Sequence, residues 1–449
     1  MNSAVYHRIF RWQYTPLLLI LIVAVLVWPA SLAGPFQFDD WNVIVEQPRV
    51  HGLSEWWASM PGIRALLKLS YALNWVADPT AFSFHLVNLL IHGINIVLVW
   101  YLLRAWPQLD RIAVVCVTLV FALHPVQTEA VTYISGRSVS LMSLLLLLSI
   151  LCWLRGRGLW RLVAITCFLL AVAVRETALI LPLVLFVWQC LAGMRWRQAL
   201  RELAPMGWLL LALALLGAPM YGALMEASLA TRGPLENLAL QMDALRYLLL
   251  EPLLLLRNNI DPDLSQRPGF DVAWWISFLF LIAAVSFAWR QRNRQPGIAL
   301  AIAWFLLCMF PTNGPLARFD VVAERHLYLA LIGPAVILVT VLRSIIPQRL
   351  VILPLAALGF ILTLATVARI TDYRSESALW EATARASPNK ARVWNNLGHA
   401  YLVEKKPDRA IPALHRALEL DPDFMRAEIN LERAVEAVSK AGKSPTGYR

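Results

Sequence analysis

Long apolar runs alternate with short arginine-bearing segments along most of this chain. Eleven of these runs are candidate membrane spans, at 15–33, 82–103, 112–123, 139–153, 159–174, 178–191, 205–224, 272–288, 298–310, 327–342 and 350–367. Several are shorter than the roughly 20 residues that a helix needs to cross a bilayer, so these spans must extend into the neighbouring loops. The pattern predicts an all-α, polytopic helical membrane protein with about 11 spans.

The arginines between the runs predict an orientation. Six clusters fall on one face if there are eleven spans: Arg8 and Arg11; Arg104 and Arg111; Arg155, Arg157 and Arg161; Arg195, Arg197 and Arg201; Arg290, Arg292 and Arg294; Arg343 and Arg349. Since positively charged loops stay cytoplasmic, we expect a cytoplasmic N-terminus and an extracytoplasmic C-terminal part. The first run lacks the usual small-residue cleavage site, so we interpret it as an uncleaved span rather than a signal peptide.

One apolar segment, 238–255, contains Asp243, Arg246 and Glu251. We predict that it forms a helix lying in the outer interface of the membrane. If it spanned the membrane instead, the orientation of every later segment would be reversed.

Composition excludes a soluble globular protein. Hydrophobic residues make up 59% of the 449, charged residues only 15%, and the mean hydropathy is +0.59. The net charge of +11 follows from the arginine loops, and we find no nucleic-acid motif. All five cysteines lie in apolar runs at spacings that match no zinc, redox or disulfide pattern.

After Val367 the composition becomes that of a soluble protein. Eight residues match the offsets of a tetratricopeptide repeat: Trp394, Leu397, Gly398, Tyr401, Ala410, Leu414, Ala417 and Pro422. We predict a repeat at 391–422, a degenerate earlier helix at 380–387 and a capping helix at 430–438. Because so few repeats bury little surface by themselves, we expect them to pack against the membrane domain. Two roles stay open for them: a groove that binds a peptide, or an appendage that only stabilises the outer face by packing.

Two adjacent acids, Asp39 and Asp40, follow the first apolar run directly. Carboxylates beside a bilayer are costly unless they bind a cation or a proton, so the pair indicates a site; the alternative is a loop with two solvated acids. Four further segments on the same predicted outer face carry most of the other acids and histidines: 127–137, 175–176, 226–271 and 312–325.

The motifs in these segments resemble a known family. The Phe38-Asp39-Asp40 sequence is similar to the acid motif in the first outer loop of GT-C glycosyltransferases. More narrowly, the chain resembles bacterial relatives of the TMTC family of transmembrane and tetratricopeptide O-mannosyltransferases. The matching stretches are 64–74, 85–92, 124–131, 135–137, 175–177, 310–313 and 322–328. The departures are Ala65, where the family usually has Pro, Arg175, where many members have Lys, and a much shorter repeat array.

The resemblance implies a domain organisation and a location. Residues 1–369 would form the GT-C domain, with a first outer loop at 34–81 and an outer loop with the interfacial helix at 225–271. Residues 370–449 would form the tetratricopeptide domain. The protein would lie among the lipids of the bacterial inner membrane, with its repeats in the periplasm.

The resemblance also implies a chemistry. A sugar would pass, with inversion, from a polyprenyl-phosphate donor to a hydroxyl of a periplasmic protein or glycan, with the repeats as a candidate contact for the acceptor. A first-loop carboxylate can act as base, and we favour Asp39, with Asp40 orienting it. The remaining candidates are a third catalytic acid, Glu129, and donor or substrate ligands: Arg64, His124, Arg137, Arg175, Glu324, Arg325 and Tyr328.

Other roles stay open for several of these residues. The arginines at 137, 175 and 325 are cations for the leaving phosphate, or else interfacial anchors or partners of Glu324, Glu176 or Glu129. Glu129 either holds substrate hydroxyls or pairs with Arg137. His124 is equally well explained as a helix-end hydrogen-bonding residue.

No metal or other cofactor is expected. Asp39, Asp40, Glu129 and His51 have the ligand types for a divalent cation, but relatives with lipid-monophosphate donors generally work without one. His85, Asn88 and His92 share one helix face, which favours helix packing over a metal site.

Three other classes of membrane protein fit the sequence less well. A transporter of lipid-linked glycans would carry its charges near the bilayer midplane. A membrane-anchored tetratricopeptide scaffold for envelope assembly would not need acids and histidines in several outer loops. An enzyme resembling the O-antigen ligases would depend on a large late loop.

Overall fold

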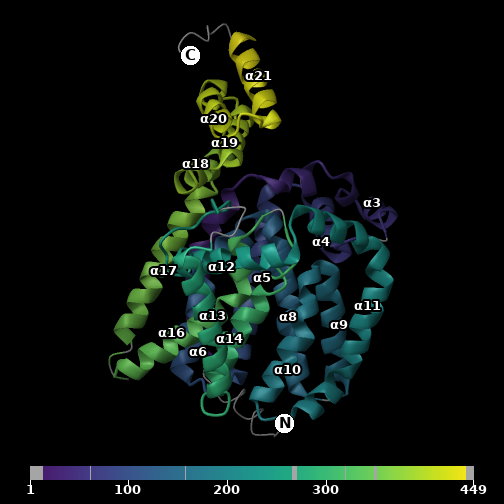
Figure 1. The fold of residues 1–449 in the computed structure, drawn as a ribbon, viewed down its shortest axis with the longest axis vertical. Helices are drawn as coiled ribbons and strands as arrows, with labels where there is room; N and C mark the ends of the chain where they lie inside the picture. The colour runs from purple at the N-terminus through teal and green to yellow at the C-terminus, as the bar shows by residue number, and fades with distance from the viewer. Residues whose placement is uncertain are drawn as a thin grey trace.

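The computed structural model describes residues 14–60, 62–156, 158–264, 270–318, 320–347, 350 and 352–440. Within these residues all regular structure is helical (Figure 1). Four of the arginines used to predict the orientation lie outside the described residues, together with the N-terminus itself: Arg8, Arg11, Arg157 and Arg349.

The long apolar helices form the body of the molecule. They are α2 (Thr15–Val27), α5 (Ala81–Ala105), α6 (Arg111–Leu123), α8 (Arg137–Arg155), α9 (Leu159–Val174), α10 (Leu181–Leu191), α11 (Trp196–Thr231), α13 (Val272–Gln291), α14 (Pro296–Met309), α16 (Ile332–Ile345) and α17 (Ile352–Asp372). Shorter or peripheral helices join them: α3 (Leu53–Ala58), α4 (Ala65–Ala77), α7 (Thr128–Val131), α12 (Pro234–Leu250) and α15 (Leu327–Ala330).

The predicted count of eleven spans is not confirmed. Among the described residues five helices are long and apolar enough to cross a membrane, or up to seven if each of two bent pairs counts as one span. One pair bends by 48° between Leu123 and Pro125, where proline cannot continue the helical hydrogen bonds. The other bends by 58° between Ala330 and Ile332. The orientation, which depends on an odd count, therefore stays a prediction.

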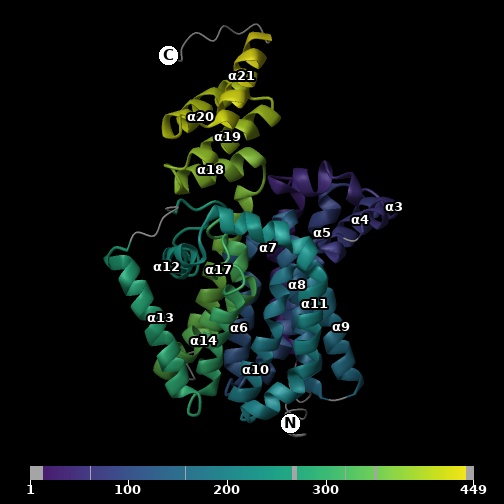
Figure 2. The ribbon, with the colours of Figure 1, turned by 45° about the vertical axis from the view of Figure 1, so that its right-hand side comes forward.

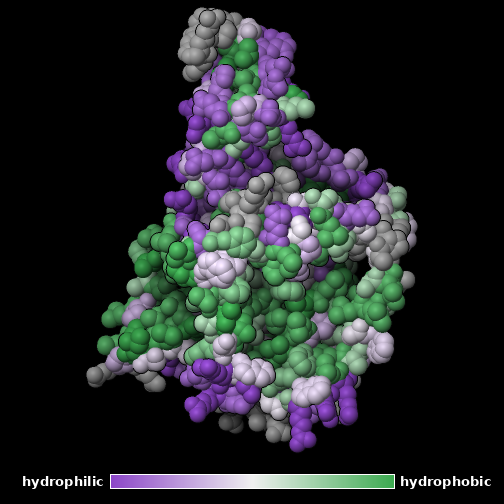
Figure 3. All heavy atoms as spheres, in the orientation of Figure 1, coloured by the Kyte–Doolittle hydropathy of each residue, from purple (hydrophilic) through white to green (hydrophobic). Residues whose placement is uncertain are grey.

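An apolar belt crosses the face of the body that Figure 3 shows. Hydrophobic residues fill the middle of this face, and hydrophilic residues lie above and below them. Helix α13 illustrates the outward-facing surface, because Ile276, Leu279 and Phe280 on it are more than half exposed. A belt of this kind is what a bilayer covers. Helix α12, in the segment predicted to be interfacial, runs across the long helices rather than alongside them (Figures 1 and 2).

The C-terminal helices confirm the tetratricopeptide repeat. Helices α18 (Glu376–Ala386), α19 (Ala391–Val403), α20 (Pro407–Leu420) and α21 (Met425–Lys440) stack above the body (Figure 2). At Gly398 an added Cβ would come within 2.6 Å of two side-chain carbons of Leu414, so the close contact between α19 and α20 requires glycine. The buried cluster of this region also includes Tyr133 and Ile260, which ties the repeats to the membrane domain.

The orientation can be tested at Glu419, whose side chain is 63% exposed on α20. We expect a Glu419→Cys variant to react with a membrane-impermeant maleimide in intact spheroplasts, because the predicted topology puts the repeats outside. The unmodified chain is the control, since each of its five cysteines is buried or half-buried. Labelling only after lysis would move the repeats to the cytoplasm.

Candidate functional site

The first outer loop turns tightly at the acid pair. Phe38 adopts a left-handed backbone with φ of 50°. The backbone N–H of Gln37 donates to Asp40 Oδ2 at 3.0 Å, and the backbone N–H and hydroxyl of Ser135 donate to Asp40 Oδ1 at 2.8 and 2.5 Å. Asp40 is buried, which raises the pKa of its carboxyl to about 7 although the hydrogen bonds from Ser135 and Gln37 oppose the shift. Asp40 therefore joins the first loop to the turn that precedes α8.

Asp39 differs from its neighbour because its side chain is only half-buried. Its backbone N–H donates to the Tyr133 hydroxyl at 3.1 Å. Burial raises the pKa of the Asp39 carboxyl, while the charge of Arg325 and a hydrogen bond with Tyr133 act in the opposite direction. Of the two acids, Asp39 is the one that an external molecule can reach.

Glu129 and Arg325 form an ion pair across the site. Arg325 Nη1 lies 2.5 Å from Glu129 Oε1, and the Arg325 backbone N–H donates to Oε2 at 2.8 Å. The Glu129 side chain is 1% exposed, whereas that of Arg325 is 19% exposed. Glu129 therefore holds Arg325 from within the protein, and the Arg325 side chain stays partly exposed.

Glu324 is not the partner of Arg325. It accepts hydrogen bonds from the Tyr247 hydroxyl at 2.8 Å, from Asn258 Nδ2 at 2.9 Å and from the Asn259 backbone at 2.6 Å. The side chain is buried, so it fixes the segment after α12 against the turn before α15.

Three further arginines gather around Glu176. Arg64 makes a two-point contact, with Nε at 3.1 Å and Nη2 at 2.7 Å, and Arg318 Nη2 lies at 3.5 Å. Arg175 is buried and donates to the Ser138 hydroxyl at 2.9 Å. The charges of Arg64, Arg318 and Arg325 all act on Arg175.

These four arginines, Arg64, Arg175, Arg318 and Arg325, are called the arginine cluster below. Two carboxylates, Glu129 and Glu176, contact them directly, and the charges of Asp39 and Asp320 also act on Arg325. Guanidinium groups grip pairs of phosphate oxygens, so the cluster has the side chains that a phosphate site uses.

Two predicted ligands, Arg137 and His124, instead make hydrogen bonds inside the protein. Arg137 is fully buried and donates to Asn88 Oδ1 at 2.7 Å, to Asn74 Oδ1 at 2.8 Å and to backbone oxygens. His124 Nδ1 accepts from the Val126 backbone N–H at 3.2 Å, as a helix-end residue does. Pairing of Glu129 with Arg137, one of the sequence-based alternatives, is not what the structure contains.

Tyr328 is buried between the helices. Its hydroxyl is 2.8 Å from His92 Nδ1 and 3.0 Å from Asn95 Nδ2, and His85 Nε2 is 3.1 Å from the Gly34 carbonyl oxygen. The polar face of α5 is therefore used for contacts between helices. In the described part of the chain, no group of three or more His, Cys, Asp or Glu side chains is arranged to hold a metal.

Sequence reasoning missed Arg318 and Tyr133. Both lie in segments that the sequence marked as outer loops, 312–325 and 127–137, but no local spacing singles them out. Only their contacts do: Tyr133 reaches Asp39 over 94 residues of sequence, and Arg318 reaches Glu176 over 142.

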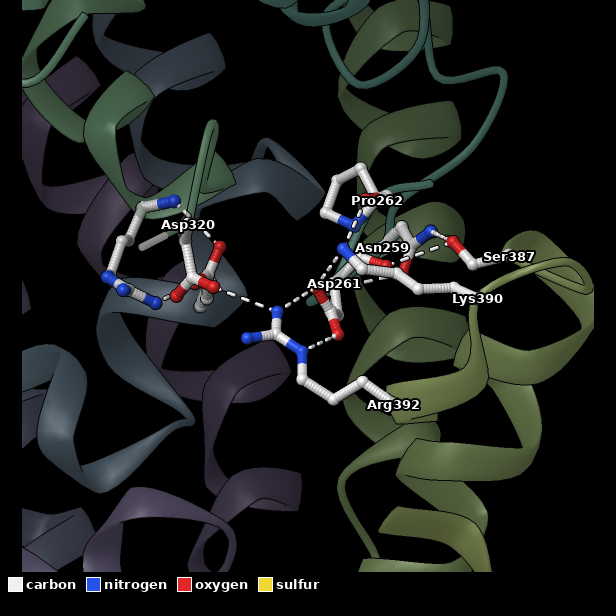
Figure 4. Close-up of polar contacts among 9 residues, drawn as sticks. Asn259, Asp261, Pro262, Asp320, Ser387, Lys390 and Arg392 are labelled. Atoms are coloured by element: carbon white, nitrogen blue, oxygen red, sulfur yellow. Dashed lines mark hydrogen bonds and ion pairs between the residues drawn. The ribbon is translucent and has the colours of Figure 1, made fainter. Parts of the chain in front are cut away.

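A charged latch, defined as Asp261, Asp320, Lys390 and Arg392, joins the repeats to two outer loops (Figure 4). Arg392 binds Asp261 through Nε at 2.9 Å and Asp320 through Nη2 at 2.8 Å. Lys390 Nζ lies 2.6 Å from Asp261 Oδ1. Because Asp320 belongs to the same loop as Arg318, the latch couples the position of α19 to the arginine cluster.

The geometry defines a class: a helical, membrane-type body, one end of which carries a half-buried carboxylate, an arginine cluster and a tetratricopeptide repeat. The tetratricopeptide repeat family matches residues 391–424. No solved structure matches the chain.

The curated relatives narrow this class. "Protein O-mannosyl-transferase TMTC3" of Mus musculus is 24% identical over 96% of this chain and 54% of its own length. "Protein O-mannosyl-transferase Tmtc3" of Drosophila melanogaster is 25% identical over 93% of this chain and 54% of its own length. "Protein O-mannosyl-transferase TMTC1" of Mus musculus is 33% identical over 29% of this chain and 16% of its own length. The chain is a relative of the TMTC family, and it spans about half the length of the TMTC3 relatives it matches.

Proposed function

We propose that this chain transfers a sugar from a polyprenyl-phosphate donor to a hydroxyl of an extracytoplasmic acceptor, with inversion and with Asp39 as the base. The observation that carries the proposal is the position of Asp39, a half-buried carboxylate beside the arginine cluster. A base and a cationic site for the leaving group are the two parts that such a transfer requires. The names of the relatives support a glycosyltransferase, with mannose as the first sugar to test.

The proposed reaction is a single displacement. The acceptor oxygen attacks C1 of the sugar on the face opposite the phosphate, and Asp39 takes the hydroxyl proton. The bond between C1 and the phosphate oxygen breaks, and the electron pair leaves with the lipid phosphate. Attack from the opposite face inverts the configuration at C1, which makes the stereochemistry of the product an independent check.

The arginine cluster would neutralise the leaving phosphate. The Arg325 side chain is partly exposed, and Arg64 and Arg318, which both contact Glu176, add two further guanidinium groups. Glu129, buried beneath Arg325, acts as a positioning residue rather than as a second base. Because guanidinium groups supply this positive charge, the proposed reaction needs no divalent cation.

The proposed setting is the outer face of a bacterial inner membrane. The apolar belt lies against lipid, so the donor's polyprenyl chain can stay in the bilayer while its phosphate reaches the outer face. The acceptor is a periplasmic protein or glycan.

The direct test incubates the purified chain with a panel of polyprenyl-phosphate sugars and a threonine-containing peptide. We expect release of lipid phosphate together with a glycosylated product of inverted configuration, strongest with one sugar of the panel. Transport of intact lipid-linked sugar across a vesicle membrane without bond cleavage would instead support a transporter. Absence of both activities would leave the scaffold interpretation.

A further inference from the structure

A groove of about 600 Å³ runs between the repeats and the first outer loop. Residues of α18, α19 and α21 line it together with the first-loop residues Phe38, Trp41, Asn42 and Glu46. The groove is therefore built jointly by the repeat domain and by the loop that carries Asp39.

One residue of the groove lining, Phe38, is the sequence neighbour of Asp39. Phe38 packs edge-to-face on Trp380 at 5.1 Å between ring centroids. The ring of Phe38 also stacks on Tyr133, with 6.3 Å between ring centroids, and the Tyr133 hydroxyl accepts the Asp39 N–H. The groove therefore reaches the residue next to Asp39.

Amide side chains line the repeat wall. Asn430 Nδ2 donates to Asn395 Oδ1 at 3.0 Å, and Asn395 Nδ2 donates to Asn396 Oδ1 at 3.3 Å, while Asn42 faces them from the first loop. An amide side chain has both a donor and an acceptor, as a peptide group has, so a row of them suits a polypeptide backbone.

The remaining lining also fits a polypeptide. The apolar side chains of Val403 and Ile429 are exposed there, at 47% and 41%, and a sugar would not need them. Arg433 and Glu46 add charges of both signs. A concave surface of stacked repeat helices with this mixed lining suits a segment that carries varied side chains.

We infer that this groove holds an extended polypeptide segment of the acceptor, so that a serine or threonine at its inner end reaches Asp39. The inference rests on the proposed function and deepens it, because it makes the acceptor a protein and assigns the repeats to acceptor binding. Contacts between the acceptor backbone and the asparagine side chains of the groove would tolerate many acceptor sequences. The side chains of the acceptor would set which sequences bind best.

The test compares two substitutions on the same helix. Ile429 lines the groove and is 41% exposed, whereas Val435 lies outside the lining and is 38% exposed. Ile429→Trp fills the groove, and Val435→Trp is the matched control, since neither change disturbs a buried side chain. Two acceptors are compared. One is an unstructured peptide of about 20 residues with one threonine, which is long enough to occupy the groove and the candidate site together. The other is a blocked tripeptide with the same threonine.

We expect Ile429→Trp to raise the KM for the long peptide by about tenfold or more, the scale of one lost contact region. The KM of Ile429→Trp for the tripeptide should not change, and the KM of Val435→Trp should not change for either acceptor. Equal behaviour of the two variants would overturn the inference, and so would an oligosaccharide acceptor whose use falls in Ile429→Trp while peptide use does not.

A binding measurement separates this inference from the proposed function. If no acceptor is glycosylated, fluorescence anisotropy of the labelled long peptide with the full chain still tests the groove. Weaker binding in Ile429→Trp alone would support the peptide groove without the transfer reaction. Transfer to the tripeptide with no difference between the variants would keep the proposed function and reject the groove.

Discussion

Asp39→Asn is expected to lower the rate of sugar transfer by more than about a hundredfold, the usual scale for removing a positioned base. The amide cannot accept the acceptor proton, and the substitution keeps the size of the side chain. Because Asp39 is only half-buried, the melting temperature should change little. Steady-state transfer and thermal melting on the same preparations are the two measurements.

Asp40→Asn is the comparison, because the structure separates the roles of the two acids. Both Asp40 oxygens accept hydrogen bonds, so an amide nitrogen would face the N–H of Gln37 or of Ser135. Leaving one buried donor unpaired costs about 1–3 kcal/mol, so this variant should melt at a lower temperature. Near-normal turnover in Asp39→Asn would move the base elsewhere, and Glu129 would be the next acid to test.

The same carboxylate predicts the pH dependence. Burial raises the pKa of Asp39, so transfer should increase with pH up to a value above that of an ordinary aspartate, as the base becomes deprotonated. Tyr133→Phe removes a hydrogen bond that lowers this pKa, so it should shift the acid limb of the rate profile to higher pH. An unchanged pH profile in Tyr133→Phe would show that the group whose deprotonation limits the rate is not Asp39.

Arg325→Ala is expected to weaken donor binding by about ten- to a hundredfold, because a charge-assisted hydrogen bond to the phosphate contributes about 1.5–3 kcal/mol. It should also destabilise the protein by about 3–5 kcal/mol, since Glu129 would remain buried without its partner. Arg325→Lys should recover only part of the donor affinity, because lysine keeps the charge and loses the planar fork.

Donor titration at constant acceptor, with thermal melting of each variant, measures the two effects separately. Arg416→Ala is the control, because Arg416 lies on α20 and pairs with the exposed Glu419. A lower melting temperature with unchanged donor affinity would show that Arg325 serves only as the partner of Glu129.

Part of the candidate site was predictable because several of its residues are neighbours in the sequence, next to apolar runs. The acid pair directly follows an apolar run, and Arg175 and Arg325 each precede or follow a glutamate beside another run. The assignment of partners was not predictable in this way. Neighbours in sequence suggested Glu324 for Arg325, but the contact is with Glu129, 196 residues away. Arg137 also looked like a ligand for an anion and is buried against neutral acceptors instead.

The sequence by itself determined the features that depend on local periodicity: the apolar helices, the outer acid pair and the tetratricopeptide offsets, which need only the side chains within one or two turns. The eleven spans that hydropathy predicts are not confirmed: five helices of the described residues, or up to seven if each bent pair counts as one span, are long and apolar enough to cross a membrane. The tertiary structure decided which carboxylate is accessible, which arginines form the cluster and how the first loop meets the repeats. Those outcomes rest on contacts across 94 to 338 residues, such as Tyr133 with Asp39, Arg325 with Glu129 and Glu376 with the Phe38 backbone. No local pattern encodes a contact at that separation.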